Sequence, residues 1–589
     1  MMSEDKVNEM IQGWRDTPEE DLKLEGCEQL QTVGAACLNE GDGERLLKFV
    51  QDEKNQVIVK SMGCGLLAPL VSEVVKNKES HDHCQAAITQ LTKTCSPNKL
   101  MQSFLEVIEN TDPGVISETI LALLPHLQTV LLQLDERKAA GVGLVLSALQ
   151  KQLSWLPVPY TQQQEEADQY GLCRCCRALT MLAQPFVEEV KKKDENLMSS
   201  DEDEEMKTEL LKFCMRSLRE PLLEADLNRG RKSALWLHAV EIMGILSATK
   251  ESLSGLLFFT SWRRGTLIDN SLSKESRACL AYLLFVQLIS MEGFPAVFSP
   301  VFILQGNMEH INHLLSSKKE SHLLKGLALF SKSLEKVEDN SLPVGLLELK
   351  SFGKAPQNLR YVLINCPLQH LRKSGLQDFQ LFINKLDAEA KHKFFRCMLK
   401  TSNHAGVEAY IVKNIKNEIQ SSMKGNANKW FLGPDLLPLL ELVLHLPQGA
   451  ETDLLTNMDK IMETLNLLRY LLIRDQQLKS SVEMWKELCR IKDQYLKIVR
   501  VCISMSRAYY CAELKSLKED IQLKAKEARD AARSTRLIKT MTTRDVKVSN
   551  MSPQVQYQVL QSALVTFDMM ESVVVRIEEI TEEKLSKMH

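Results

Sequence analysis

Apolar residues recur along most of this 589-residue chain at intervals of three and four positions, which is the period of an amphipathic helix. The first such pattern runs from Leu22 to Cys37 and ends at Gly41. Further patterns of about 12 to 20 residues follow, separated by short polar breaks. The period-two alternation of strands is nearly absent. The pattern therefore predicts an all-α fold.

A weak internal repeat accompanies these helical patterns. Pro69, Pro185, Pro221 and Pro438 each precede two apolar residues and then a polar or acidic one. Proline is tolerated in the first turn of a helix, and acidic residues there suit the positive end of the helix dipole. Each proline is therefore expected to begin a helix, and the irregular spacing predicts a HEAT-like helical-repeat solenoid without a strict period. Chance recurrence in a Leu-rich chain is the alternative.

The composition, with 44% apolar and 25% charged residues, is that of a globular protein, and the charge is unevenly distributed. Between residues 354 and 429 there are 13 Lys or Arg against 5 Asp or Glu, and between 479 and 547 there are 17 against 9. The net charge is −4, so the rest of the chain is acidic. We therefore divide the chain into an acidic N-terminal helical-repeat region, 1–339, and a basic C-terminal HEAT-like region, 340–589.

Two charged segments interrupt the helical pattern. Residues 191–205 read as a mobile loop, in which Ser199 and Ser200 precede an acidic run and are candidate phosphorylation sites. Residues 515–550 have few large apolar side chains, so a long exposed helix is expected there that frays into a flexible segment. Apolar periodicity then returns between Val555 and Ile577 and predicts an amphipathic final helix.

The fifteen cysteines are scattered within apolar helical patterns, which is not the spacing of a disulfide framework. The chain opens with charged residues and shows no signal peptide, and its longest apolar run, Ala278 to Ser290, is shorter than the ~18 residues of a membrane span. These features predict a reduced, cytoplasmic protein without membrane insertion.

Motifs of catalysis and cofactor binding are absent. The sequence contains no GxxxxGK[ST], GxGxxG, HExxH or GxSxG. His81 and His83 cannot share a helix face, so a solvated loop is the simpler interpretation than a metal site. Cys173 and Cys176 would share an apolar helix face with Leu179, which favours packed thiols. We therefore expect no enzyme, no metal and no cofactor.

The block 402–475 contains three helical patterns joined by a basic and aromatic loop, Lys424 to Phe431. Ser402 or Asn403 can cap its first helix. In its last helix a core stripe at every third or fourth residue places Arg469 at the rim and Arg474 opposite. The residues expected to contact a partner, from their type and predicted exposure, are Lys424, Lys429, Trp430, Phe431, Arg469 and Arg474. Trp430 can equally close the end of the core.

Binding of nucleic acid is the other reading of the basic half. A stacking platform requires aromatic residues interleaved with the basic ones, and residues 479–547 contain only four aromatic side chains beside nine acidic ones. Protein binding fits this composition better.

Several long blocks resemble the glomulin family. They lie at residues 156–176, 184–190, 402–419, 428–434, 444–455, 465–475 and 562–573, and weaker similarity covers the N-terminus. The resemblance implies a HEAT-like protein whose C-terminal region binds the RING subunit of cullin–RING ubiquitin ligases, together with the cullin, and covers the surface that receives the ubiquitin-charged E2. Such a protein inhibits by occlusion and performs no chemistry.

The resemblance also implies links to FK506-binding immunophilins, to the hepatocyte growth factor receptor, and to vascular and smooth-muscle development. A scaffold that joins an immunophilin to a receptor tyrosine kinase pathway is therefore the alternative function. No family block matches residues 191–205, 515–550 or the tail after Glu583.

Overall fold

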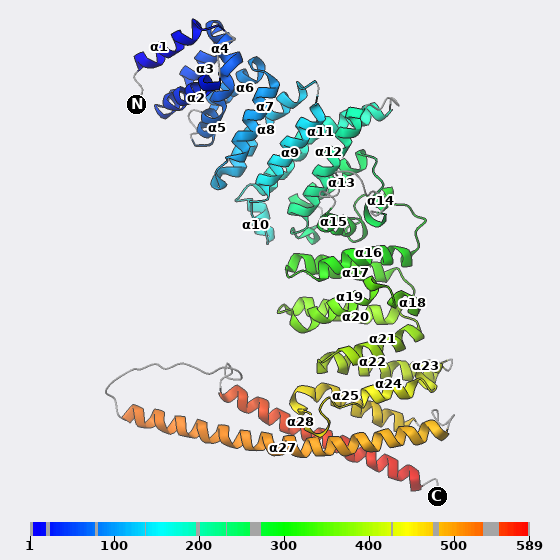
Figure 1. Ribbon diagram of the computed structural model, residues 1–589. Coiled ribbons are helices and arrows are strands. Elements are labelled where there is room, and N and C mark those ends of the chain that lie inside the picture. The colour runs from blue at the N-terminus through cyan, green and yellow to red at the C-terminus, as the bar shows by residue number, and fades with distance from the viewer. Residues whose placement is uncertain are drawn as a thin grey trace. The chain divides into compact units, whose positions relative to one another are not determined.

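The computed structural model describes residues 4–18, 24–76, 81–135, 137–195, 201–230, 233–259, 273–425, 428–474, 482–533 and 553–586 (Figure 1). Within these ranges the regular structure is helical, and the only β-type pairing is an isolated bridge between Leu342 and Leu386. The predicted all-α fold class is confirmed.

Contacts between residues divide the chain into two compact units. The N-terminal unit comprises Met1–Val337, Lys354–Val362 and Cys366–Asp378. The C-terminal unit comprises Glu338–Gly353, Leu363–Asn365 and Phe379–His589. The boundary predicted at 339/340 lies beside the first residue of the C-terminal unit, but the chain crosses between the units again before residue 379.

Helices of the first part of the chain are short to medium in length. Their bounds are α1 (Glu4–Arg15), α2 (Leu24–Asn39), α3 (Gly43–Gln51), η2 (Glu53–Asn55), α4 (Gln56–Met62), η3 (Gly63–Leu66), α5 (Leu67–Lys76), α6 (His81–Thr94), α7 (Pro97–Glu109), η4 (Pro113–Val115), α8 (Ile116–Leu132), α9 (Lys138–Leu153), α10 (Gln162–Ala167), α11 (Leu172–Glu195), α12 (Asp201–Ser217), η5 (Leu218–Leu222), η6 (Leu227–Arg229), α13 (Ala234–Ala248), α14 (Leu253–Phe258), α15 (Lys274–Phe285), η8 (Met291–Gly293), α16 (Pro300–Leu315) and α17 (Glu320–Glu335).

The later helices include two much longer ones. Their bounds are α18 (Val344–Leu347), α19 (Lys350–Asn365), α20 (Gln369–Lys385), α21 (Ala388–Thr401), α22 (Ala405–Lys424), α23 (Lys429–Leu432), α24 (Leu436–Val443), η9 (Gly449–Glu451), α25 (Leu454–Ile473), α27 (Val482–Arg533) and α28 (Pro553–Ser586).

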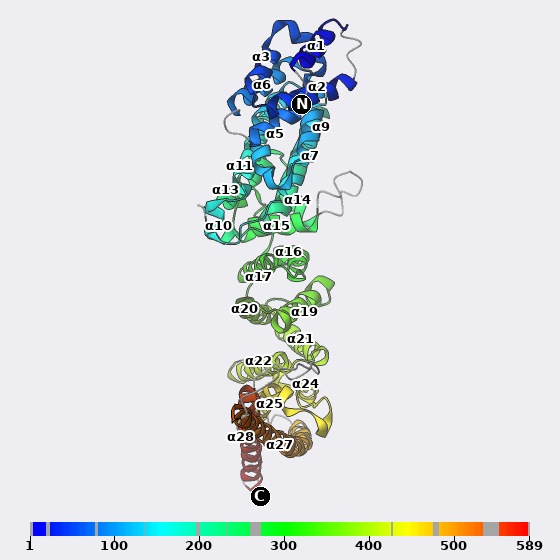
Figure 2. The same cartoon turned by 90° about the vertical axis from the view of Figure 1, so that its left-hand side faces the viewer.

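The helices of each unit stack in two layers. In the N-terminal unit α5, α8, α11 and α13 contact one another in series, and α7, α9, α12 and α15 form the second series (Figure 2). In the C-terminal unit the two series are α22, α25 and α28, and α21, α24 and α27. Such stacking of helix pairs is the architecture of a helical-repeat solenoid, in which each repeat buries its apolar face against its neighbours.

Local sequence signals explain where many helices begin. Ser299 precedes α16 and its hydroxyl accepts a hydrogen bond from the backbone N–H of Phe302 at 3.2 Å, and Pro300 is the first residue of the helix. Asp387 caps α21 in the same way, accepting from the N–H of Ala390 at 2.7 Å. These caps satisfy donors that have no partner within the helix.

The four repeated prolines occupy three different positions. Pro69 and Pro438 lie in the first turn of α5 and α24, as predicted. Pro185 instead lies in the middle of α11, and Pro221 follows a cis peptide bond in η5. A proline inside a helix costs roughly 3 kcal/mol, and α11 continues through it because Phe186 and its neighbours are buried on both sides.

The two charged segments are more helical than predicted. Residues 191–195 end α11 and residues 201–205 begin α12, so most of the predicted mobile loop is wrong. Acidic residues 201–204 suit the N-terminus of α12, which explains why a charge run can start a helix. Ser199 and Ser200 lie outside the described residues. Residues 515–533 belong to α27, as the predicted long helix requires, and the rest of 515–550 lies outside the described residues.

Two other local predictions need correction. His81 and His83 lie in the first turn of α6 and not in a loop, because Cys84 is buried and ties this turn to the core. The stretches 53–76 and 113–132 are long and apolar enough to span a membrane by length and composition, although no run near Ala278 is. About half of each stretch is buried inside the protein, as is also the case for core helices of a folded domain.

All fifteen cysteines are free thiols, and most of them are buried. Cys173 and Cys176 pack in the core as predicted, and burial raises the pKa of the Cys173 thiol to about 12. Cys397 and Cys511 are exposed and so depart from the expectation that the thiols are core residues.

Candidate protein-binding surface

The candidate surface lies at one end of two neighbouring helices of the C-terminal unit, α22 and α25. The predicted core stripes are confirmed, since Ile411 and Ile415 on α22 and Ile461 and Leu465 on α25 are fully buried. The cap of α22 was wrongly assigned. His404, and neither Ser402 nor Asn403, precedes the helix, and its Nδ1 accepts from the N–H of Val407 at 3.4 Å.

Contacts between α22 and α25 show that the two helices run parallel. Near their N-terminal ends the Lys460 ammonium lies 2.5 Å from a Glu408 carboxylate oxygen. Near their C-terminal ends the Tyr470 hydroxyl donates to the Met423 sulfur at 3.8 Å. Parallel stacking places the C-terminal ends of both helices at the same edge of the unit.

This arrangement places three of the predicted cations on that edge. Lys424 is the last residue of α22, Arg474 caps the end of α25, and Arg469 lies one turn earlier; all three are exposed. A cation at a helix C-terminus also interacts favourably with the helix dipole, which is a structural role independent of any partner. The edge therefore offers fixed positive charge to a partner.

The loop that follows α22 folds back as the short helix α23. Asn428 caps this helix by accepting from the N–H of Trp430 at 3.0 Å. The Lys429 ammonium lies 4.9 Å from the centre of the Trp430 ring, and the His392 ring lies 5.3 Å away. Trp430 is half-buried, so its ring both packs on the unit and presents an edge to solvent.

Phe431 does not belong to the surface. Its side chain is fully buried and packs against the rings of His392 and Phe395, with centroids 6.0 Å and 6.2 Å away. The prediction that Phe431 contacts a partner is corrected for this reason. His392 donates from Nε2 to the Asp435 carbonyl at 2.9 Å, and burial lowers its pKa, so the ring is neutral at pH 7.

A strip of exposed apolar residues on α27 was missed from the sequence. Val501, Met505 and Tyr509 follow one another at intervals of four and expose 46%, 50% and 60% of their area. On α28, Val565 and Met569 repeat this spacing and are 56% and 54% exposed. The spacing of four was the available signal, but it does not tell an exposed stripe from a buried one.

Ion pairs hold α27 and α28 together beside this strip. The Arg507 guanidinium lies 2.7 Å from Asp568 and 2.6 Å from Glu571, and Arg500 pairs with Glu578. Beneath them Phe567, Met570 and other residues of the α28 stripe are fully buried. Val555 and Val559, at the start of that predicted stripe, are instead 43% and 40% exposed. The apolar strip thus rests on a packed helix pair.

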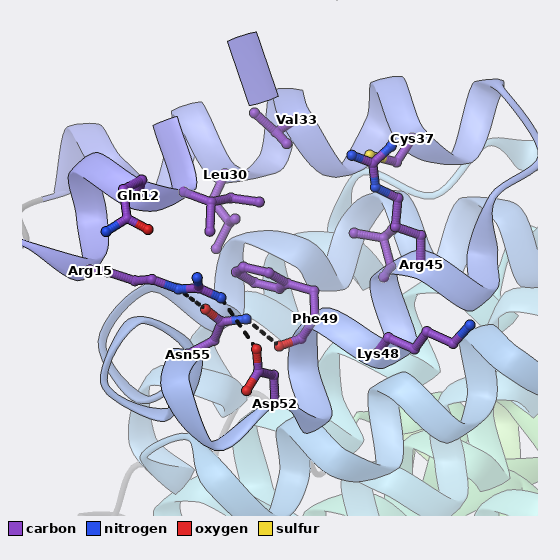
Figure 3. Close-up of a pocket in the computed structure, with 12 residues that line it drawn as sticks. Gln12, Arg15, Leu30, Val33, Cys37, Arg45, Lys48, Phe49, Asp52 and Asn55 are labelled. Carbon is purple, nitrogen blue, oxygen red and sulfur yellow. Dashed lines mark hydrogen bonds and ion pairs between the residues drawn. The ribbon is translucent and has the colours of Figure 1, made fainter. Parts of the chain in front are cut away.

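The N-terminal unit contains a hollow that is a second candidate site. It has a volume of about 410 Å³ and lies between α1, α2 and α3 (Figure 3). Leu30 and Phe49 contribute to its apolar lining. Arg15 reaches from α1 and donates to Asn55 at 2.8 Å and to Asp52 at 3.2 Å.

The polar groups of this hollow satisfy one another. Asn55 is 2% exposed and donates to the Phe49 carbonyl at 3.0 Å, while Lys48 pairs with Glu44 at 2.7 Å. Arg15 therefore links α1 to the segment that contains Asp52 and Asn55. No cluster of three metal-ligating side chains occurs anywhere in the described part of the chain.

By its fold the chain is a helical-repeat protein, a class whose extended surfaces commonly bind other proteins. Its sequence matches the model of a family described as "Uncharacterised protein family, YAP/Alf4/glomulin" over residues 10–254 and 260–563. It is 43% identical to glomulin of Homo sapiens over 99% of this chain and 98% of that protein. Against glomulin of Mus musculus the identity is 42% over the same shares. The chain belongs to the glomulin family.

Solved structures with a detectable likeness are helical too. The karyopherin Kap121p bound to the SUMO protease Ulp1p is 12% identical, with a TM-score of 0.23 over 85% of this chain and 54% of that chain. A circular tandem repeat protein is 11% identical, with a TM-score of 0.14 over 99% and 97%. These scores are too low to carry any argument about function.

Proposed function

We propose that the protein is a non-catalytic inhibitor of cullin–RING ubiquitin ligases, whose C-terminal unit docks on the RING subunit and blocks access of the E2. Membership of the glomulin family supports the partner class. The main support for this docking surface is the exposed apolar strip on α27, formed by Val501, Met505 and Tyr509. The strip lies on two helices, α27 and α28, that pack together and are joined by ion pairs.

Physical complementarity supports this docking. A RING presents to E2 an apolar groove with polar edges, and a rigid surface can cover such a groove with little rearrangement. The strip supplies apolar area near the start of α25, and the edge that carries Lys424, Arg469 and Arg474 supplies positive charge towards the other end of that helix. A standard interface buries on the order of 1,600 Å² in total, which two long helices can provide.

Inhibition by occlusion requires no reacting group. A protein that occupies the E2 surface competes with the E2, so excess E2 should relieve the inhibition in proportion to its concentration. A cytoplasmic location is part of the proposal, and the fifteen free cysteines are compatible with a reducing compartment.

The test is a reconstituted ubiquitination reaction with a purified cullin–RING ligase, E2 and full-length protein. The double variant Val501→Glu/Met505→Glu should weaken inhibition at least tenfold, because it places charge in the apolar contact. Leu144→Glu is the matched control, since Leu144 is 56% exposed on α9 of the other unit. Full chain formation in the presence of excess wild-type protein would sink the proposal.

A second pair of substitutions examines the cationic edge and α23. Trp430→Ala together with Arg469→Glu should weaken binding to the RING while changing the melting temperature by only a few degrees, because Trp430 is half-buried and Arg469 is exposed. A large fall in melting temperature would instead assign Trp430 to the core.

The alternative scaffold function predicts a different distribution of binding. If the protein links an immunophilin to a receptor kinase pathway, the N-terminal half should carry most of the binding to those partners in pull-downs with each half of the chain. Ubiquitination by the reconstituted ligase would then proceed unchanged by the wild-type protein.

A further inference from the structure

Two thiols of the N-terminal unit meet where η3 crosses α2. Cys64 lies in η3 between Gly63 and Gly65, and Cys27 lies on α2. A Cβ atom built on Gly65 would stand 2.5 Å from the Cys27 carbonyl oxygen, so only glycine allows the two backbones to approach this closely. Cys64, the residue before Gly65, is thereby held close to Cys27, and its thiol contributes to the raised pKa of Cys27.

The two thiols of this pair are also accessible. Cys27 and Cys64 are both half-buried. Cys95 lies close by, but it is 6% exposed and its thiol donates to the Val59 carbonyl at 3.1 Å. The third thiol is therefore packed and already has a partner, which leaves Cys27 and Cys64 as the pair open to a small oxidant.

We propose that Cys27 and Cys64 are an oxidation site, at which hydrogen peroxide converts the two thiols into an intramolecular disulfide. The Cys64 sulfur attacks one oxygen of the peroxide, the O–O bond breaks and one water leaves, which produces a sulfenic acid. The Cys27 sulfur then attacks the Cys64 sulfur, and the departing hydroxyl takes the Cys27 proton as a second water. Two thiols are oxidised and one peroxide is reduced.

The environment of the Cys27 sulfur sets this order. Burial, with a contribution from the neighbouring Cys64, raises the pKa of Cys27 to about 11. Cys27 therefore stays protonated at neutral pH and serves as the resolving thiol, since the thiolate is the form that attacks peroxide. The disulfide joins α2 to η3 and so restrains the first helices of the unit.

The experiment treats the reduced, purified full-length protein with hydrogen peroxide, blocks the remaining thiols, and maps peptides by mass under non-reducing conditions. A linked pair of peptides containing Cys27 and Cys64, two hydrogens lighter than their sum, is expected. Cys64→Ser should abolish it, and Cys27→Ser should leave a sulfenic acid at Cys64 that dimedone traps.

Cys397→Ser is the control, because Cys397 is an exposed thiol of the other unit and its loss should leave the yield of the link unchanged. The proposal is overturned if the wild-type protein forms no link between Cys27 and Cys64. It is also overturned if Cys64 links to Cys95 instead, or if Cys27→Ser traps no sulfenic acid at Cys64.

Discussion

Three buried lysines are compensated differently in the two units. In the N-terminal unit the Lys325 ammonium is almost fully buried, donates to the Ala225 carbonyl at 2.5 Å and lies 5.4 Å from the centre of the Tyr282 ring. In the C-terminal unit Lys391 and Lys460 are equally buried, but each reaches a carboxylate on another helix. The Lys391 ammonium lies 2.8 Å from Glu418, between α21 and α22.

The two kinds of buried lysine therefore have different effects on the packing of the helices. A lysine paired across successive helices fixes their relative register, because any slip leaves both charges buried without a partner. Lys325, which contacts only a backbone carbonyl and an aromatic ring, does not fix the register of two helices. Its charge is also poorly solvated. The C-terminal unit is therefore expected to be the more rigid surface, and the four predictions below test the contrast.

The largest effect is expected from breaking a cross-helix pair. Lys460→Met leaves the Glu408 carboxylate, whose side chain is 8% exposed, without its cation. Loss of one partner of a buried pair costs roughly 3 to 5 kcal/mol. The shift of the unfolding transition of this unit in urea measures the cost, with exposed Lys413→Met on α22 as the control.

The double variant Lys460→Met/Glu408→Leu should recover most of that loss, because replacing both charges removes the desolvation penalty along with the attraction. If Lys460→Met costs less than about 1 kcal/mol, the pair does not fix the register of α22 and α25.

An unpaired buried carboxylate in the N-terminal unit should give a pH-dependent effect. Asp378 is 5% exposed, its Oδ2 has no hydrogen-bond partner, and burial raises its pKa to about 7. As pH rises from 4 to 7 the unfolded chain loses this proton and the folded protein keeps it, so stability falls across that window. Asp378→Asn should therefore stabilise by about 4 kcal/mol at pH 8 and by almost nothing at pH 4.

Melting curves of the Asp378→Asn variant and the wild type from pH 4 to 8 test this directly. Exposed Asp82→Asn on α6 is the control and should show no such divergence. A gain from Asp378→Asn that is equal at every pH would mean that the charge of Asp378 does not oppose folding.

A smaller gain is expected at Lys325. Burial lowers its pKa to about 8, so between pH 8 and about 10.4 the unfolded chain binds more protons and stability rises with pH. Lys325→Met removes this penalty but leaves the Ala225 carbonyl without its donor, and a net gain of about 1 kcal/mol at pH 7 is expected. Denaturation at pH 7 and pH 10 measures it, and a gain that grows with pH would contradict the sign.

The smallest effect on stability is expected from loss of the exposed ion pair between Arg15 on α1 and Asp52. The Arg15 and Asp52 side chains are 29% and 40% exposed, and ion pairs of this kind contribute about 0 to 1 kcal/mol. Arg15→Ala should leave global stability within ~0.5 kcal/mol but speed proteolytic cleavage before residue 18. Gln12→Ala, on the same helix, is the control, and equal cleavage rates in both variants would contradict the role of Arg15 in linking α1.

Periodicity predicted the fold well because core packing leaves a direct trace in the sequence. The core stripe predicted for the last helix of the block, α25, is buried, since an apolar side chain every third or fourth position needs a neighbouring helix to cover it. Turn and cap chemistry was less informative. Pro185 sits inside α11 because burial of its neighbours outweighs the lost hydrogen bond.

The candidate surface could be predicted only in part. Lys424, Arg469 and Arg474 are exposed as expected, because charged side chains rarely lie in a core. Phe431 was wrongly predicted to lie at the surface, and the exposed strip on α27 was not predicted. Both errors have one cause. The sequence pattern of an apolar residue on a helix is the same whether or not a neighbouring helix covers its side chain. Only the tertiary arrangement determines whether the side chain is exposed.

The cross-helix pairs of the C-terminal unit have a consequence for how such a protein evolves. Repeat arrays commonly change length when recombination duplicates or deletes a repeat. Deletion of the segment that carries α22 would strand both Lys391 and Lys460, each of which takes its carboxylate from that one helix. We therefore expect this part of the array to tolerate substitutions better than the deletion of a helix.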